Sequence, residues 1–181
     1  MARARPDVFM VGLDIRERIV AANERQREDE GLINLRFGYV NLNVDLDRVF
    51  EANRVRRFHL LFPDPWLKSR HRKRRVIETE LLDVIVAQLV PGGELHFASD
   101  VFEVALEAMA ELEEHPAFSN LAEPWSFWRG NPFPTCSRRE AITRSRGQRV
   151  WRLRYVVPPG DHSTATARAE ERSASSSTSG K

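Results

Sequence analysis

The sequence predicts an α/β fold built around a doubly wound parallel sheet. Short apolar runs typical of buried strands alternate with longer stretches of helical spacing, which is the pattern of a parallel sheet with helices on its faces. Polar side chains follow the ends of the predicted strands, where sheets of this kind bind their ligands. The 181 residues suffice for one domain with a sizeable core.

The predicted elements follow one another closely along the chain. Apolar runs predict strands at residues 8–15, 32–40, 57–62, 94–100 and 148–157. Helical spacing predicts helices at residues 16–29, 45–53, 76–90 and 104–114. In the third of these helices, four apolar residues form one stripe, Leu81, Leu82, Ile85 and Leu89. Pro91-Gly92-Gly93 is expected to end that helix.

Composition limits the location and class of the protein. Residues 161–181 are rich in Ser, Thr and Ala, which predicts a disordered tail after a domain at residues 1–160. No apolar run approaches the roughly 20 residues that a membrane span requires. The single cysteine, Cys136, excludes an internal disulfide and fits a reducing compartment. The histidines lack metal-ligand spacing, so we expect no metal. From the lone cysteine and the lack of a long apolar run we expect a cytoplasmic protein with no membrane segment.

One aspartate stands between two prolines directly after the third predicted strand, in the string Phe62-Pro63-Asp64-Pro65-Trp66. The prolines fix the backbone and remove amide donors, so we expect the Asp64 carboxylate to point into a site. The alternative is an aspartate that stabilises its own turn. The tryptophan and the cations that follow at once favour the functional interpretation.

Six cationic side chains follow within the eight residues 68–75. Cations at this density repel one another unless a polyanion is present, and nucleic-acid phosphates are the natural partner. Trp66 beside them is suited to stacking on an accessible base, as in RNA recognition. A solvated basic surface is the alternative. Lys68 is the cation nearest Asp64 along the chain, and we expect it to reach into the site.

Three further polar residues follow predicted strands. Asp14 ends the first strand, where a carboxylate can hold two ribose hydroxyls; the alternative is an acid that complements the dipole of the next helix. Asn41 follows the second strand and either contacts an adenine edge or stabilises a turn. Asp100 ends the fourth strand. Carboxyl ends of parallel strands share one edge, so this convergence predicts an enzyme.

Two features near the C-terminus leave alternatives open. Trp125, Phe127 and Trp128 in the loop at residues 125–135 either cover the core, which we favour, or form a platform for a base. Cys136 has no sign of a nucleophile environment and is taken as structural.

Together these residues resemble the tRNA (guanine-N7)-methyltransferase family over roughly residues 9–157. The most specific part is Phe-Pro-Asp-Pro-Trp, followed one residue later by lysine and then by the basic run. Gly12-Leu13-Asp14-Ile15 is similar to a strand end of the family, and Ser99-Asp100 is similar to its Thr-Asp. The resemblance implies a Rossmann-like class I methyltransferase sheet, S-adenosyl-L-methionine as cofactor, and methylation of guanine N7 in tRNA.

The resemblance also implies a role for each matched residue. Asp14, Asn41 and Asp64 would bind the cofactor, and Asp64 would be the catalytic residue. Lys68 and Asp100 would bind the tRNA substrate. Where the family often has Asp-Ala, this chain has Asn41-Leu42, which keeps a polar group but loses a charge.

A second substrate-binding group is implied near the C-terminus. Ser137-Arg138-Arg139-Glu140 falls at the offset of the family's Thr-x-x-Glu, with serine in place of threonine. Ser137, Arg138, Arg139 and Glu140 would therefore hold the nucleotide, with Thr135 as the less favoured alternative for the hydroxyl.

One part of the family pattern has no counterpart in the sequence. Class I methyltransferases begin with a strand and a Gly-rich loop behind the cofactor, whereas only Met1–Asp7 precede the first strand here. We therefore expect an N-terminally incomplete sheet, arising from an internal start of the reading frame or from a degenerate copy. The alternative function is a non-catalytic tRNA-binding remnant of such an enzyme, and the sequence leaves a monomer or a homodimer equally open.

Overall fold

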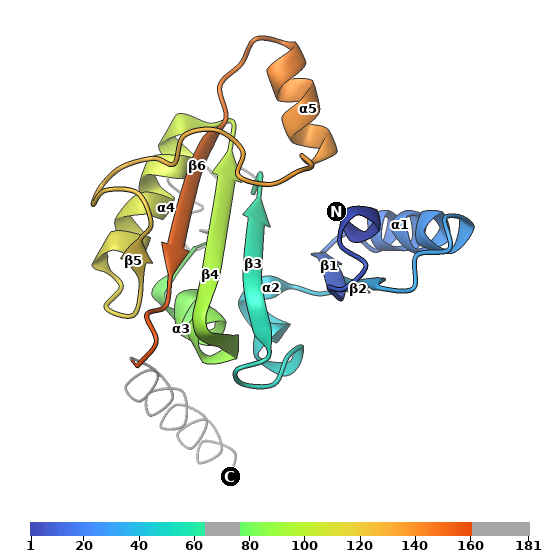
Figure 1. The fold of residues 1–181 in the computed structure, drawn as a ribbon, viewed down its shortest axis with the longest axis horizontal. Coiled ribbons are helices and arrows are strands. Elements are labelled where there is room, and N and C mark those ends of the chain that lie inside the picture. The colour runs from blue at the N-terminus through green and yellow to red at the C-terminus, as the bar shows by residue number, and fades with distance from the viewer. Residues whose placement is uncertain (64–76, 161–181) are drawn as a thin grey trace. The chain divides into compact units, whose positions relative to one another are not determined.

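The computed structural model describes residues 1–63 and 77–160. The chain divides into two compact units (Figure 1). The first contains Met1–Val49 and Pro132–Thr135, and the second contains Phe50–Asn131 and Cys136–Lys181. The basic run with Asp64 and Lys68, and the predicted tail, lie outside the described residues.

The first unit is built on two parallel strands. A short 3₁₀ turn (Ala2–Ala4) precedes β1 (Met10–Asp14), which pairs with β2 (Leu35–Tyr39). The register places Asp14 opposite Tyr39, so both strands end at the same edge. Gly12 is required in β1 because a Cβ there would lie 2.5 Å from the ring of Phe37.

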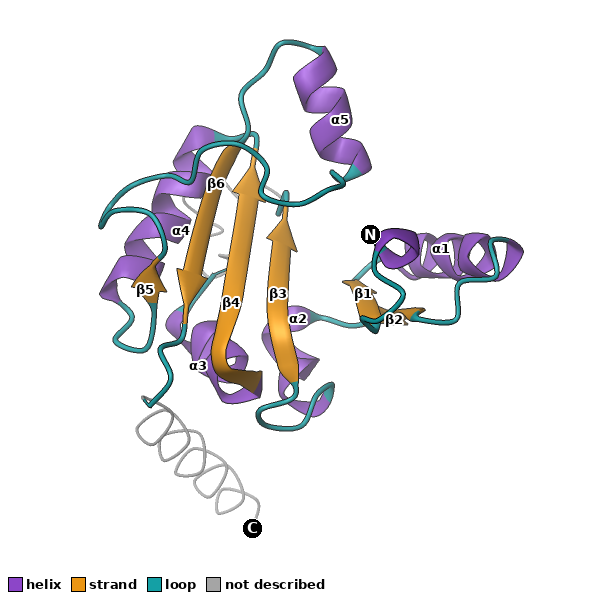
Figure 2. Cartoon of the chain, in the orientation of Figure 1, coloured by secondary structure: helices purple, strands orange, loops and turns teal. Residues whose placement is uncertain are grey.

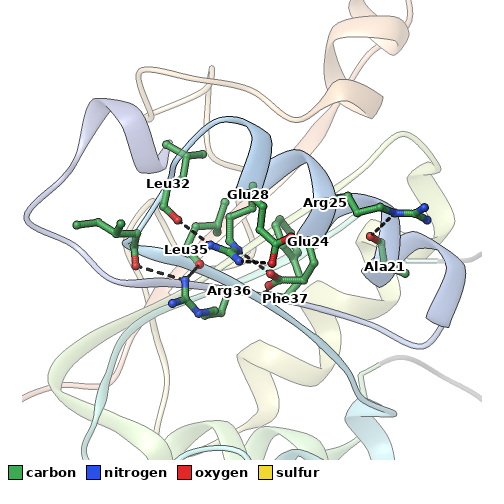
Figure 3. Close-up of polar contacts among 10 residues, drawn as sticks. Ala21, Glu24, Arg25, Glu28, Leu32, Leu35, Arg36 and Phe37 are labelled. Atoms are coloured by element: carbon green, nitrogen blue, oxygen red, sulfur yellow. Dashed lines mark hydrogen bonds and ion pairs between the residues drawn. The ribbon is translucent and has the colours of Figure 1, made fainter.

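The charged side chain of Glu24 links helix α1 (Glu17–Asp29) to β2 (Figure 3). Glu24 accepts a hydrogen bond from the backbone N–H of Phe37 at 2.5 Å, and its other oxygen accepts one from Arg27 Nε at 2.6 Å. Helix α1 has no buried residue. Polar contacts therefore position this helix more than an apolar core does.

The second unit contains a mixed sheet of four strands in the order β3-β4-β6-β5 (Figure 2). Strand β3 (Val55–Leu61) runs parallel to β4 (Leu89–Ser99). Strand β6 (Trp151–Val156) runs antiparallel to β4, and the short β5 (Ser119–Asn120) pairs antiparallel with β6. The predicted α/β class is confirmed, although the last strands depart from an all-parallel sheet.

One face of this sheet carries the core. Its buried residues form two rows across β3, β4 and β6, namely Phe58, Leu95 and Tyr155, then Leu60, Phe97 and Leu153. Helices α3 (Thr79–Gln88) and α4 (Phe102–Glu114) add buried apolar side chains. The predicted stripe of the third helix is confirmed at Leu81, Leu82 and Ile85, which are buried on α3. Leu89 is buried too, but as the first residue of β4 rather than as part of the helix.

The opposite face of the sheet is polar. His59 and His96 are register partners on β3 and β4, with ring centroids 5.4 Å apart. Burial lowers the pKa of His59 to about 4 and that of His96 to about 3, so both rings are neutral near pH 7. Beside them Glu94 accepts hydrogen bonds from Arg57 at 3.1 Å and from Arg154 at 2.9 Å.

The predicted stop at Pro91-Gly92-Gly93 is wrong. Helix α3 ends at Gln88, and the three residues lie inside β4, where the register with β3 shifts. Gly92 has φ +75°, which a residue with a Cβ rarely adopts, and a Cβ on Gly93 would lie 2.8 Å from the Val90 carbonyl oxygen. The glycines therefore allow an irregularity within a strand rather than a helix stop.

Two other local predictions differ from the structure. The helix predicted at residues 45–53 begins earlier, as α2 (Leu42–Asp45) followed by a 3₁₀ turn (Leu46–Arg48), because Asn41 caps it. Helix α5 (Arg138–Ser145) was not predicted. Among the described residues, no helix is long and apolar enough to cross a membrane.

Candidate active site

Asp14 and Asn41 lie at the carboxyl edge of the two-stranded sheet. Asp14 is the last residue of β1, and its carbonyl accepts a hydrogen bond from the backbone N–H of Val40 at 3.1 Å. Asn41 follows β2 directly after Val40 and forms the N-cap of α2. The structure therefore brings these two predicted site residues to one edge, as expected for parallel strands.

Arg16 occupies most of the hydrogen-bonding capacity of the Asp14 carboxylate. Oδ1 accepts from the Arg16 backbone N–H at 2.8 Å and from its Nε at 3.0 Å, and Oδ2 accepts from its Nη2 at 2.9 Å. The hydrogen bond from Arg16 lowers the pKa of the Asp14 carboxyl. A carboxylate oxygen has two acceptor sites, so Oδ2 retains one for a ligand hydroxyl.

Asn41 uses its side-chain oxygen locally. Its Oδ1 accepts a hydrogen bond from the backbone N–H of Asn43 at 3.3 Å. This contact makes Asn41 a cap of α2, which was the alternative interpretation of the sequence. Within the described part of the chain, the side-chain NH2 of Asn41 donates no hydrogen bond. This group could donate to a ring nitrogen of adenine.

Asp100 lies in the second unit, just past the end of β4. Arg139 donates to its Oδ2 from Nε at 2.9 Å, and Arg139 Nη2 lies 2.7 Å from the same oxygen. The hydroxyl of Thr143, one helical turn along α5 from Arg139, donates to it at 3.2 Å. The structure therefore joins two of the predicted substrate-binding residues, Asp100 and Arg139.

Ser137 and Glu140 shape the start of α5. The Ser137 hydroxyl accepts a hydrogen bond from the backbone N–H of Glu140 at 3.1 Å, which is an N-cap contact. The Glu140 carboxylate is buried and accepts from Arg152 Nη2 at 2.5 Å. Arg138 is exposed at the first position of the helix. In this structure Ser137 and Glu140 therefore hold the helix in place.

A strained residue leads into the Asp64 segment. Phe62 has φ +52°, which is rare for a bulky side chain and costs of order 1–3 kcal/mol. Its backbone N–H donates to the Ala98 carbonyl of β4 at 2.7 Å, which holds it at the carboxyl edge of the sheet. Strain of this kind is concentrated at functional sites.

Comparison with known proteins identifies the family. Residues 1–153 match the family model described as "Putative methyltransferase". The chain is 36% identical over 161 residues to a tRNA (guanine-N(7)-)-methyltransferase of Microcystis aeruginosa, covering 87% of this chain and 75% of the relative. A Synechococcus elongatus protein of the same name is 36% identical over 165 residues, covering 89% and 76%.

The chain belongs to the tRNA (guanine-N(7)-)-methyltransferase family.

Solved structures agree with this family at the level of the fold. The antibiotic-resistance methyltransferase Kmr superimposes with a TM-score of 0.55 at 19% identity, covering 88% of this chain and 80% of Kmr. At this identity the likeness supports the class I methyltransferase fold and nothing finer.

Only some of the site residues implied by the family resemblance lie in the described part of the chain. Asp14, Asn41, Asp100 and residues 137–140 are described, whereas Asp64 and Lys68 are not, so their roles stay predictions. Sequence reasoning missed Thr143 and Arg152. Thr143 had a usable signal, because it lies four residues after Arg139 on one helix face. No sequence signal indicated Arg152, because the sequence pattern of a strand does not show which arginine is buried.

The aromatic loop divides between packed and exposed side chains. Phe127 lies 5.0 Å from the Trp151 ring, and the guanidinium carbon of Arg154 lies 4.4 Å from the Trp128 ring. Trp125 is 56% exposed. Among residues 1–63 and 77–160, no group of three or more His, Cys, Asp or Glu side chains is arranged to hold a metal ion.

Proposed function

We propose that this chain transfers a methyl group from S-adenosyl-L-methionine to N7 of a guanine in tRNA. The observation that carries the proposal is the 36% identity, over most of the chain, to relatives named for this reaction. The Phe-Pro-Asp-Pro-Trp string and the basic run after it supply an acid, an aromatic and cations suited to an RNA base and its phosphates.

Asp14 and Asn41 fit the nucleoside half of the cofactor. The remaining acceptor site on Oδ2 of Asp14 can take one ribose hydroxyl while Arg16 stays in place. The Arg16 side chain is 66% exposed, so the ion pair costs about 1 kcal/mol or less to open. Rotation of the Arg16 side chain would leave one acceptor site on Oδ1, beside the backbone N–H of Arg16, and two on Oδ2, enough for two hydroxyls. The Asn41 amide would donate to the adenine edge.

Asp64 is the proposed catalytic residue and a cofactor ligand. When bound, S-adenosyl-L-methionine supplies a methyl group whose bond to sulfur breaks as the N7 lone pair of guanine forms the new bond, leaving the base positively charged. N7 carries no proton, so the protein does not need a strong base, and positioning provides most of the catalysis. The Asp64 carboxylate would orient the guanine and favour its developing positive charge.

The residues around Asp100 are proposed to hold the nucleotide. Lys68, Arg138 and Arg139 provide positive charge for phosphates. Asp100 would accept hydrogen bonds from the base or ribose, in the orientation set by Arg139 and Thr143. Ser137 and Glu140 would act through the placement of α5, since their side chains cap and fasten that helix. The cytoplasm, where tRNA is modified, is the proposed location.

The test is a methylation assay with the purified chain, a tRNA transcript and S-adenosyl-L-methionine carrying a labelled methyl group. We expect N7-methylguanosine in the wild type and at least a hundredfold lower rate for Asp64→Ala. Asp47→Ala removes an exposed aspartate elsewhere and is the matched control. A rate near wild type for Asp64→Ala would reject the role of Asp64.

Calorimetric titration with S-adenosyl-L-methionine separates the enzyme from the non-catalytic alternative. An enzyme binds the cofactor and tRNA. A chain that binds tRNA in a salt-sensitive way, yet neither binds the cofactor nor methylates the transcript, would be an RNA-binding remnant.

A further inference from the structure

The excess of positive charge in this chain comes from two segments. Residues 68–75 contain six cations and no acid, and residues 138–152 contain six arginines and one glutamate. The rest of the chain then holds 16 of the 28 cations and 25 of the 26 acids. Outside these two segments the protein is net acidic, so a polyanion is attracted to the two segments and repelled elsewhere.

The arginines of the second segment serve two purposes. Arg139 pairs with Asp100, and Arg152 pairs with Glu140, so these two arginines fasten α5 to the sheet. The other four are exposed, Arg138, Arg144, Arg146 and Arg149. Within residues 1–63 and 77–160, none of these four lies in an ion pair with an acidic side chain.

Local contacts hold the segment that carries the exposed arginines. Helix α5 has a side-chain N-cap at Ser137 and a buried ion pair beneath it. Beyond the helix, the guanidinium carbon of Arg149 lies 4.8 Å from the centre of the Trp151 ring, so a stacking contact limits its rotation. Arginines held in place by packing lose less entropy when they bind a phosphate.

The second basic segment begins at the carboxyl edge of the sheet. Arg139 and Thr143 attach α5 to Asp100, at the carboxyl end of β4. Strand β3 runs parallel to β4 and ends at Leu61, so both strands end at this edge. A ligand that binds at this edge therefore lies beside the helix that carries Arg138 and Arg144.

We propose that Arg138, Arg144, Arg146 and Arg149 form a second basic surface that binds phosphates of the tRNA backbone. Arg138 was already implied by the family resemblance, and the other three positions are new. Guanidinium groups bind phosphate through paired N–H donors, and no acidic partner within the described residues competes for them. The inference rests on the proposed function, because it names the part of the protein that holds the substrate away from the methylated base.

The test compares tRNA binding by wild type and by the triple variant Arg144→Gln, Arg146→Gln, Arg149→Gln over a range of KCl concentrations. Each lost phosphate contact lowers the slope of log affinity against log salt by about 0.7–0.9. We expect the triple variant to lose a slope of about 2 and at least tenfold in affinity near physiological salt.

Two further variants identify the cause of the loss. The triple variant Arg18→Gln, Arg25→Gln, Arg48→Gln removes the same charge from exposed positions elsewhere, and we expect it to keep the wild-type slope. The triple variant Arg144→Lys, Arg146→Lys, Arg149→Lys keeps the charge without the paired donors, so it should keep most of the slope with weaker binding.

The outcomes distinguish this inference from the proposed function. Salt-sensitive tRNA binding by wild type, with an unchanged slope in the glutamine variant, would overturn the second basic surface and leave the methyltransferase proposal intact. Absence of tRNA binding by wild type would overturn both. An equal loss of affinity for polyglutamate and for tRNA would overturn the assignment of this surface to RNA.

Discussion

Arg139 Nη2 lies 2.7 Å from Oδ2 of Asp100, although the two residues are 39 positions apart in the sequence. The contact joins the end of β4 to helix α5, and the Thr143 hydroxyl reinforces it at 3.2 Å. Asp100 therefore presents a carboxylate whose direction is set by a residue of the same predicted substrate site.

Loss of this contact should affect activity more than stability. The Arg139 side chain is 63% exposed, so Arg139→Ala should lower the free energy of unfolding by about 1 kcal/mol or less. The same change should lower kcat/KM for tRNA about tenfold, because Asp100 loses its strongest hydrogen-bond donor. Urea unfolding and initial rates provide the two measurements, with Arg48→Ala as control. Equal rates in both variants would contradict the prediction.

The Glu140–Arg152 pair should behave in the opposite way. Both side chains are less than 10% exposed, so removing one partner leaves a buried charge without its counterion. Arg152→Met or Glu140→Leu alone should cost about 3–5 kcal/mol of unfolding free energy. The double variant should cost less than the two single changes combined, because it leaves no buried charge. Additive losses in urea unfolding would show that the pair does not act as a unit.

Cofactor affinity should depend on Asp14 and not on its partner. Asp14→Ala removes the acceptors proposed for the ribose, and charged hydrogen bonds of this kind contribute about 1.5–3 kcal/mol each, so affinity for S-adenosyl-L-methionine should fall at least tenfold. Arg16→Gln should bind at least as tightly as wild type, since it releases Oδ2 of Asp14. Calorimetric titration measures both. Tighter binding by Asp14→Ala than by Arg16→Gln would be inconsistent with the proposed ribose site.

The buried histidine pair should make stability fall in mild acid. The pKa of each ring is near 6.5 in the unfolded chain, whereas burial lowers it to about 4 for His59 and about 3 for His96 in the folded protein. The unfolded chain therefore binds more protons, and stability decreases as pH falls from about 6.5 towards 4. Nearby Arg57 and Arg154 add to the effect, and Glu94 opposes it at His59.

The measurement is the unfolding free energy at pH 7 and at pH 5. Each histidine should contribute up to about 1.4 kcal/mol per pH unit below its unfolded pKa. The double variant His59→Gln, His96→Gln should lose less stability between the two pH values than wild type does. His162→Gln is the control, and a double variant with the wild-type pH dependence would rule out the pair as its source.

Local patterns predicted most elements because their causes are local. Leu81, Leu82 and Ile85 recur with helical spacing, and that spacing by itself places these apolar residues on one face of α3. Pro91-Gly92-Gly93 misled the prediction because the same residues suit a helix stop and an irregular strand. Backbone hydrogen bonds with Val157 hold Gly92 and Gly93 in the strand, and no pattern within the three residues records that partner.

For the candidate site too, local motifs were predictable from the sequence, whereas contacts between elements were not. The sequence by itself determined the family, through the Phe62–Trp66 string and the basic run, since a motif is a property of neighbouring residues. Only the tertiary structure decided that Asp100 meets Arg139 and that Glu140 is buried against Arg152. Each of these contacts joins different elements, so its existence depends on how α5 and the sheet pack and not on the residue types alone.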